Sequence, residues 1–335
     1  MEMFKGKNIF VTGACGSIGS EIVKNLLKYD VNKIYAFDID EIKQFMSQQV
    51  LDDDRIEFLT GNVCNLDTLK RCFSLDKVDI VYHAAAMKHV VICEQSPMES
   101  VRNNVIGTQN VVDSALRHDV KRMINISTDK AASPVNVMGA SKFITERITL
   151  NANKITDSSR VFSCVRFGNV ANTRGSIIPV LVENIRKGNT LKLTDPNVTR
   201  FIMGINDTIN LIFKATEVAQ GGEIFILKMK AFKLGDLFDV FRDKISLKFS
   251  TQPEDITIKE TGLIFGEKLH EDLINNIELN NLYERDDMYV VLPPSRTSTI
   301  TKAKLSSYSS EDVELISKDE LEKYVLDYLK TSRLV

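Results

Sequence analysis

The feature that most constrains the fold is a glycine-rich turn near the N-terminus, Gly13-Ala14-Cys15-Gly16-Ser17-Ile18-Gly19. It directly follows the apolar run Ile9-Phe10-Val11 and opens a helical stretch from Ser17 to Leu27. In a strand-turn-helix context the first glycine permits the tight turn, the second lets the backbone approach a pyrophosphate, and the third permits close packing of helix on strand. The pattern therefore predicts a Rossmann-type first half whose glycine turn binds a dinucleotide.

An acidic residue nineteen positions after the last of these glycines indicates which dinucleotide is bound. Asp38 ends the second apolar run, where a carboxylate accepts hydrogen bonds from the adenosine ribose and repels a 2′-phosphate. NAD is therefore favoured over NADP. The alternative is that Asp38 caps the next helix together with Asp40 and Glu41. Asn62 and Val63 end the third run and are candidates either for contact with the adenine or for a simple turn.

Short apolar runs that alternate with helical stretches predict an α/β fold with a doubly wound parallel sheet. The six expected strands are residues 8–12, 33–38, 56–60, 80–83, 122–127 and 161–166. Ligands bind at the carboxyl ends of such strands, so function is expected near Gly13, Asp38, His83, Ser127 and Arg166. We expect an NAD-binding domain at residues 1–168, to which the segment near 204–230 returns, and mainly a smaller substrate-binding lobe with a C-terminal helix at 169–335.

Composition narrows the choice of partner and compartment. The 43 basic and 45 acidic residues nearly cancel, which argues against nucleic acid or a membrane surface as a partner and favours a small molecule. Five cysteines and four histidines lack the spacing of a disulfide framework or a zinc site, so no metal is expected. The chain shows no signal peptide and no apolar run near the ~20 residues of a membrane helix, which indicates a cytoplasmic protein. Ser317 and Glu320 form a capping box for an amphipathic final helix.

Further motifs resemble the extended short-chain dehydrogenase/reductase superfamily, and more narrowly the UDP-N-acetylglucosamine 4,6-dehydratases. The broader resemblance rests on the glycine turn, His83-Ala84-Ala85-Ala86 and Asn104-Val105-Ile106-Gly107-Thr108. It implies that Ala84 and Ala85 belong to the cofactor site. The narrower resemblance rests on motifs at residues 127–131, 136–142, 166–170, 174–179, 199–201 and 266–271, so that together the motifs span most of the chain.

The resemblance implies an NAD-dependent dehydration of UDP-N-acetylglucosamine to a UDP-4-keto-6-deoxy-N-acetylhexosamine. In this family carbon 4 is oxidised by hydride transfer, water is eliminated across carbons 5 and 6, and the hydride returns to carbon 6. By resemblance Asp129 is the acid and Lys130 is the base. A base must be neutral, and we expect desolvation and the positive nicotinamide to depress the pKa of Lys130. The alternative is a solvated Asp-Lys pair at a helix start.

The chain departs from the superfamily at Met138, where most members carry the tyrosine of a Tyr-x-x-x-Lys motif. A thioether does not exchange the proton of the 4-hydroxyl. Thr128, Lys130 and Lys142 remain open as the group that does so, and we expect Thr128 to hydrogen-bond the 4-hydroxyl while Lys142 acts electrostatically. Lys142 shares a helix face with Met138 and is expected to bind the nicotinamide ribose, beside which Met138 packs.

Substrate contacts follow from the same resemblance. Asn169, Arg174 and Arg200 match positions around the nucleotide diphosphate, with surface salt bridges as the alternative for the arginines. Lys88 follows the fourth strand and is expected to reach the sugar or a neighbouring subunit. Glu267 belongs to a motif whose lobe closes over the uridine, and no specific role is assigned to it.

Several alternatives remain open at this stage. The sequences of the motifs favour retention of configuration at carbon 5, with inversion as the alternative. A nucleotide-sugar 4-epimerase or reductase would share the fold, and the missing tyrosine leaves a non-catalytic NAD-binding regulator as a further alternative. The resemblance also implies a homo-oligomer, either a dimer or a hexamer.

Overall fold

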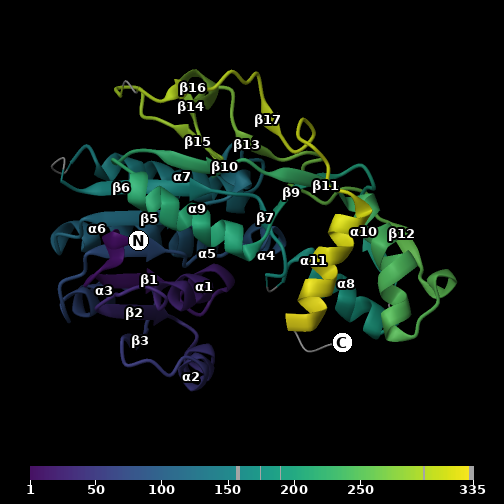
Figure 1. The fold of residues 1–335 in the computed structure, drawn as a ribbon, viewed down its shortest axis with the longest axis horizontal. Coiled ribbons are helices and arrows are strands. Elements are labelled where there is room, and N and C mark those ends of the chain that lie inside the picture. Colours follow the sequence, from purple (N-terminus) through teal and green to yellow (C-terminus); the bar gives the residue numbers. More distant parts are fainter. Residues whose placement is uncertain (156–158, 174, 189, 297–298, 332–335) are drawn as a thin grey trace.

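The computed structural model describes residues 1–155, 159–173, 175–188, 190–296 and 299–331. Figure 1 shows a large sheet on one side of the molecule and a helical second lobe, with α8, α10 and α11, on the other. Among the described residues the large sheet has ten strands, in the order β16-β14-β15-β10-β6-β5-β4-β1-β2-β3.

The first half supplies the parallel part of this sheet. Its strands are β1 (Asn8–Thr12), β2 (Lys33–Asp38), β3 (Ile56–Thr60), β4 (Ile80–His83), β5 (Arg122–Ile126) and β6 (Val161–Arg166). These bounds confirm the six expected strands, except that β5 ends one residue earlier. The order reverses between β1 and β4, and the crevice at such a switch point is where doubly wound folds bind nucleotides.

Helices cover both faces of the sheet because each strand alternates with a helix. On one face lie α1 (Ser17–Leu26) and α9 (Ile205–Val218), and on the other lie α3 (Leu66–Phe73), α6 (Gly107–Arg117) and α7 (Val137–Ala152). Shorter helical elements are α2 (Glu41–Val50), α4 (Val90–Gln95), α5 (Pro97–Ser100), η2 (Val101–Ile106) and η3 (Asp129–Ala131). Each face has its own apolar core, so the carboxyl ends of the strands are positioned rigidly.

The second half of the chain returns to the sheet twice. The segment expected near 204–230 contributes α9 and the parallel strand β10 (Ile224–Leu227). A later segment, which the sequence assigned to the second lobe, adds antiparallel strands beyond β10: β15 (Met288–Val291), β14 (Leu282–Arg285) and β16 (Thr301–Lys302). In Figure 1 these strands form the upper edge of the molecule.

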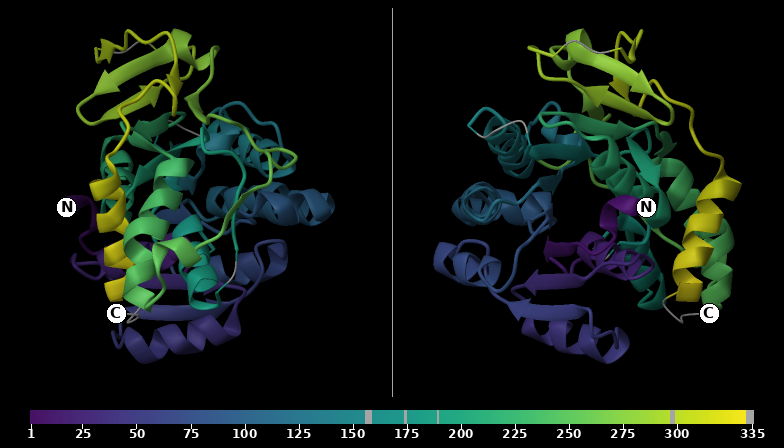
Figure 2. Two further views of the ribbon diagram at one scale, coloured as in Figure 1. Left: turned by 90° about the vertical axis from the view of Figure 1, so that its right-hand side faces the viewer. Right: turned by 60° about the vertical axis from the view of Figure 1, so that its left-hand side comes forward.

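The second lobe has a separate apolar core around α8 (Ile177–Arg186), α10 (Leu234–Val240) and α11 (Lys318–Thr331). Figure 2 shows α11 lying beside α10. Small sheets join the lobe to the Rossmann part: β7 (Asn169–Val170) with β9 (Thr199–Met203) and β11 (Lys230–Lys233), β8 (Leu191–Leu193) with β12 (Ile258–Glu260), and β13 (Asp272–Ile274) with β17 (Tyr308–Ser309). The capping box is confirmed, since the Glu320 amide donates to Ser317 Oγ at 3.2 Å and the Ser317 amide donates to the Glu320 carboxylate at 3.0 Å.

Two of the strand-end side chains expected to face a ligand are instead sequestered inside the protein. Both ring nitrogens of His83 form hydrogen bonds inside the protein. Nδ1 lies 2.7 Å from Thr12 Oγ1, and Nε2 lies 2.9 Å from Thr108 Oγ1. Burial lowers the pKa of His83 to about 3, so this side chain is neutral. Arg166 is fully buried and binds Glu146 at 2.6 Å and Glu278 at 2.8 Å. These two side chains therefore hold the fold together and do not face the ligand crevice.

Removing one carboxylate from the Arg166 cluster tests its structural role. Glu278→Ala should lower the free energy of unfolding by about 3 kcal/mol or more, because it leaves a buried guanidinium with incomplete charge compensation. Urea denaturation followed by circular dichroism measures this change. The matched control is Glu183→Ala, since Glu183 forms an exposed ion pair with Lys187 on α8 and its loss should leave stability unchanged. Equal unfolding midpoints for both variants would contradict a structural role for the cluster.

Candidate active site

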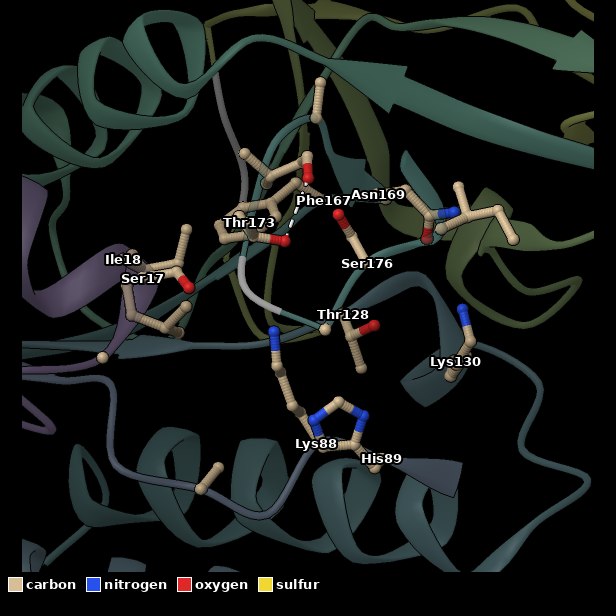
Figure 3. A pocket seen from close by; sticks show the side chains of 18 of the residues that line it. Ser17, Ile18, Lys88, His89, Thr128, Lys130, Phe167, Asn169, Thr173 and Ser176 are labelled. Atoms are coloured by element: carbon tan, nitrogen blue, oxygen red, sulfur yellow. Dashed lines mark hydrogen bonds between the residues drawn. The ribbon is translucent and has the colours of Figure 1, made fainter. Parts of the chain in front are cut away.

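A cavity of about 650 Å³ lies where the carboxyl ends of the parallel strands meet the second lobe. Its walls from the Rossmann part are the glycine turn, the loop after β4, the segment after β5, and α7: Gly16, Ser17, Ile18, Gly19, Ala84, Lys88, Thr128, Lys130, Met138 and Lys142. The chain after β6 closes the other side, with Asn169, Thr173, Ser176 and Ile178. In Figure 3 Ser17 and Ile18 lie on one side of the cavity and Lys130 and Asn169 on the other.

The glycine turn is shaped for close backbone approach. Gly13 has a φ of +65°, and a Cβ added to it would lie 2.7 Å from the Ala85 amide nitrogen. A Cβ on Gly19 would lie 2.1 Å from the Gly13 carbonyl oxygen. Only glycine fits at these two positions, and the resulting turn directs the N-terminus of α1 at the cavity. Helix N-termini favour anions, so this cradle suits a pyrophosphate.

Asp38 contacts the glycine turn and does not cap the next helix. Its Oδ2 accepts a hydrogen bond from the Cys15 amide at 2.8 Å, while Oδ1 accepts from the Asp40 amide at 3.0 Å. The side chain that caps α2 is that of Asp40, which accepts from the Lys43 amide. Asp38 is therefore fixed beside the glycine turn, and its contact with a ribose stays a prediction.

Asn62 and Val63 lie outside the lining of this cavity. Asn62 Oδ1 accepts from the Cys64 amide at 2.8 Å, which closes a turn, and Val63 is buried with its carbonyl bonded to Asn110. The turn alternative is therefore confirmed for Asn62, and contact with an adenine stays a prediction for both residues.

The segment after β5 brings an acid and an amine to the cavity wall. Thr128 and Lys130 line the cavity, and Asp129 lies directly behind them with 1% of its surface exposed. Asp129 Oδ1 accepts hydrogen bonds from Thr128 Oγ1 at 2.7 Å and from Lys130 Nζ at 3.1 Å. Its buried Oδ2 accepts none from the described residues. The alternative of a solvated Asp-Lys pair is wrong, because the carboxylate is excluded from solvent.

Lys130 is held between two carboxylates. Besides Asp129, the buried Glu271 places Oε1 3.3 Å from Lys130 Nζ. Burial acts to lower the pKa of Lys130, but the attraction of Asp129 and Glu271 outweighs it and raises that pKa. The depressed pKa expected from the sequence is therefore wrong for this arrangement, since the second carboxylate was not foreseen. The ammonium form of Lys130 is the stable one here.

Met138 and Lys142 lie one turn apart on α7, and both line the cavity. Gly139 lets α7 approach the segment after β5, because a Cβ there would lie 2.4 Å from the Lys130 carbonyl oxygen. Lys142 Nζ donates to the Ile126 carbonyl at 2.5 Å. Burial lowers the pKa of Lys142 to about 8, against the opposing effect of Glu146. The amine with the depressed pKa is thus Lys142 and not Lys130.

The expected substrate residues separate into two groups. Lys88 and Asn169 line the cavity. Arg200 and Glu267 lie outside its lining and pair with each other at 2.9 Å, and Arg200 also donates to the Thr199 carbonyl. Contact of Arg200 with a diphosphate stays a prediction. Arg174 lies outside the described residues.

Sequence reasoning missed Glu271 as a site residue. It ends the 266–271 motif on which the resemblance partly rested, so its position was visible, but nothing local indicated that it lies beside Lys130. Ser176 was also missed. It is the N-cap residue just before α8 at the cavity wall, and its buried Oγ has no hydrogen-bond partner among the described residues.

No cluster of three or more His, Cys, Asp or Glu side chains among the described residues is arranged to hold a metal ion. In the same residues no helix combines the length and the apolar character needed to cross a membrane.

Comparisons with known proteins agree on one family. Residues 9–293 match the family described as polysaccharide biosynthesis protein. A Methanocaldococcus jannaschii protein named "uncharacterized membrane protein MJ1061" is 46% identical over 96% of this chain and 95% of its own length. A Campylobacter jejuni "UDP-N-acetylglucosamine 4,6-dehydratase (inverting)" is 36% identical over 87% of this chain and 84% of its own length. A Rickettsia rickettsii "UDP-glucose 4-epimerase" is 32% identical over 98% of both chains.

Solved structures agree with the fold. The crystal structure of Pen from Bacillus thuringiensis has a TM-score of 0.91 and 36% identity, and the match covers 97% of this chain and 98% of that one. The dTDP-glucose 4,6-dehydratase DesIV from Streptomyces venezuelae, solved with NAD and TYD bound, has a TM-score of 0.72 and covers 97% and 98%, but its identity of 19% shows the fold alone.

The depressed pKa of Lys142 makes stability depend on pH. Between pH values of about 8 and about 10.5 the unfolded chain carries a proton on this lysine that the folded protein has lost, so stability rises with pH through that window. The rise should amount to about 3 kcal/mol. Urea unfolding of the nucleotide-free protein at a series of pH values measures it, and Lys142→Met should abolish this component. Parallel stability profiles for the two proteins would contradict the assignment.

Proposed function

The chain belongs to the polysaccharide biosynthesis protein family of extended short-chain dehydrogenases/reductases, and from this premise we propose that it is an NAD-dependent 4,6-dehydratase of UDP-N-acetylglucosamine. The observation that carries the proposal is that the buried Asp129 and the partly exposed Lys130 form an acid-amine pair at the same cavity as the glycine turn. Dehydration needs both an acid and a base beside the carbon that is oxidised, whereas binding alone needs neither.

The residues present fit a nicotinamide dinucleotide. The turn from Gly13 to Gly19 would hold the pyrophosphate, Asp38 the adenosine ribose, and Ala84, Ala85 and Lys142 the nicotinamide end. Bound there, NAD supplies the hydride acceptor for carbon 4 and the hydride donor for carbon 6. The NAD bound to DesIV supports the same choice for this chain. NAD is favoured over NADP, because the carboxylate of Asp38 would repel a 2′-phosphate.

Asp129 and Lys130 work as a coupled pair in the proposed reaction. Lys130 is an ammonium at rest, and its Nζ lies 3.1 Å from Asp129 Oδ1. Moving one proton along this hydrogen bond breaks an N–H bond, forms an O–H bond, and yields a neutral amine beside a carboxylic acid. The amine then removes the proton from carbon 5, and the acid gives its proton to the departing 6-hydroxyl.

The 4-hydroxyl requires different groups, because Met138 replaces the usual tyrosine. Thr128 lines the cavity next to Lys130 and is proposed to hydrogen-bond this hydroxyl. Oxidation of carbon 4 also releases the hydroxyl proton, and Lys142, whose pKa is about 8, accepts it as a neutral amine. The ammonium that forms then acts electrostatically on the new carbonyl oxygen. Lys88 and Asn169 face the same cavity, and we propose them, with Arg174, Arg200 and Glu267, as groups that position the UDP-sugar.

The stereochemical outcome at carbon 5 is proposed to be inversion. The sequences of the motifs favour retention, whereas the Campylobacter jejuni relative, which is 36% identical, is named as an inverting dehydratase. The name of this relative therefore supports inversion at carbon 5 over retention. A 4-epimerase is the second candidate, supported by the name of the Rickettsia rickettsii relative. Homo-oligomerisation and a cytoplasmic location stay predictions.

Mass spectrometry of the product tests the reaction. Purified protein incubated with UDP-N-acetylglucosamine should give a product lighter by one water, with no net formation of NADH. A product of unchanged mass would identify an epimerase, and stoichiometric consumption of added NADPH would identify a reductase. Unchanged substrate would contradict all three enzymes.

Two substitutions test the roles of the acid-amine pair. Asp129→Asn and Lys130→Ala should each lower kcat by about 10²- to 10⁴-fold while NAD still binds, because they remove proton transfer and leave the glycine turn intact. Lys187→Ala, at an exposed lysine that directly follows α8, is the matched control and should keep full activity. Full activity in Asp129→Asn would contradict its role as the acid.

Reaction in deuterium oxide tests inversion. Lys130 exchanges its proton with solvent, so the product should carry deuterium at carbon 5. Proton NMR comparison with the two carbon-5 epimers of the 4-keto-6-deoxy product should match the inverted one. A match to the retained epimer would overturn this part of the proposal and leave the dehydration standing.

A further inference from the structure

Glu271 is a buried carboxylate that the proposed reaction does not yet use. It exposes 3% of its surface, it comes from the segment that precedes β13, and its Oε1 lies 3.3 Å from Lys130 Nζ. Lys130 lines the cavity, while Glu271 and Asp129 stand behind it. Glu271 therefore holds Lys130 without lining the cavity itself.

Several contacts fix Glu271 relative to the segment after β5. Its amide donates to Ser310 Oγ at 2.9 Å. On either side of it the chain is bound to residues next to Lys130: Asn136 Nδ2 donates to the Gly266 carbonyl at 2.8 Å, and Asn275 Nδ2 donates to the Ala132 carbonyl at 2.9 Å. The backbone on both sides of Glu271 is thus fixed to the segment that carries Lys130. The contact between the two side chains is therefore an internal one.

We propose that Glu271 is a positioning residue that holds the Lys130 ammonium at the wall of the cavity and keeps it charged until the substrate is bound. The catalytic part of this inference rests on the proposed function, whereas the effect on the Lys130 proton does not.

The charges around the pair support this role. Lys130 is faced by Asp129 from its own element, by Glu271 from the segment before β13, and by Arg200 from β9. Arg200 Nε lies 4.0 Å from Glu271 Oε1 and Lys268 binds Asp272, so neither cation displaces Lys130 from Glu271. A buried ammonium with a single carboxylate would be far easier to deprotonate than one with two.

This arrangement has a consequence for the direction of proton transfer. Lys130 gives its proton to Asp129 in the proposed reaction, and the charge of Glu271 opposes that step by stabilising the ammonium. The transfer therefore needs the further desolvation that a bound substrate brings to the cavity wall. In its absence the amine stays protonated.

The test measures the proton on Lys130 directly. The full-length protein is labelled with trace acetic anhydride over a range of pH, and peptide mass spectrometry follows acetylation of Lys130, which is reachable because its side chain is 19% exposed. Glu271→Gln, which keeps the size and removes the charge, should move the midpoint of Lys130 labelling to lower pH by about one unit or more. An unchanged midpoint would overturn the proposal.

Two further variants separate charge from structure. Glu267→Gln lies in the same segment and removes a carboxylate that pairs with Arg200 instead of Lys130, so it should leave the midpoint unchanged. An equal shift in both glutamine variants would overturn the proposal, because it would reflect a loosened segment. Glu271→Asp keeps the charge at a greater distance and should move the midpoint to lower pH than in the unmodified protein, by less than about one unit. If Glu271→Gln unfolds, this shift decides the proposal, and an unchanged midpoint in Glu271→Asp would overturn it.

Turnover gives the catalytic readout. In Glu271→Gln the ionisation that Lys130 contributes to the pH profile of kcat should move to lower pH by the same amount as the labelling midpoint, with KM little changed. A lower kcat with an unshifted pH profile would show a merely structural role and overturn the proposal. If the unmodified protein dehydrates no UDP-sugar, the proposed function fails, while the labelling result still decides the role of Glu271.

Discussion

The buried ion cluster of Arg166, Glu146 and Glu278 is the interaction on which the rest of the site depends. Arg166 ends β6, Glu146 lies on α7, and Glu278 lies just before β14, so one guanidinium joins the sheet, the helix that carries Lys142, and the second half of the chain. Glu146 also accepts a hydrogen bond from Ser127 at 2.6 Å. The same buried charges therefore fix both the end of β5, which leads into Thr128, and α7, which faces it.

That fixed frame explains why two lysines at one cavity differ in their proton affinity. Lys142 donates to a backbone carbonyl, and desolvation outweighs the opposing charge of Glu146, so its pKa falls to about 8. Lys130 is also removed from water, but two carboxylates are held within 3.3 Å of its Nζ and its pKa rises. The residue type is the same, and the difference lies in what the fold places beside each amine.

The parts of the site that could be predicted are those whose contacts join residues close together in the sequence. The glycine turn, the strands and the Thr128-Asp129-Lys130 segment depend on neighbours within one strand-turn-helix unit, and local pattern was sufficient for them. Arg166 and His83 end strands as expected, yet their partners lie at positions 146 and 278, and 12 and 108, which no local pattern contains. For the same reason the expected pKa of Lys130 had the wrong direction: its second carboxylate is 141 positions away in the chain.

The 266–271 segment shows how such distant contacts become functional. Glu267 and Glu271 are four positions apart, and each neutralises a different cation, Arg200 from the second lobe and Lys130 from the Rossmann part. A short segment thereby connects the lobe expected to hold the nucleotide to the amine expected to act on the sugar. The fold thus gives this motif a physical role that its sequence alone did not show, because one stretch of backbone holds cations from two separate parts of the chain.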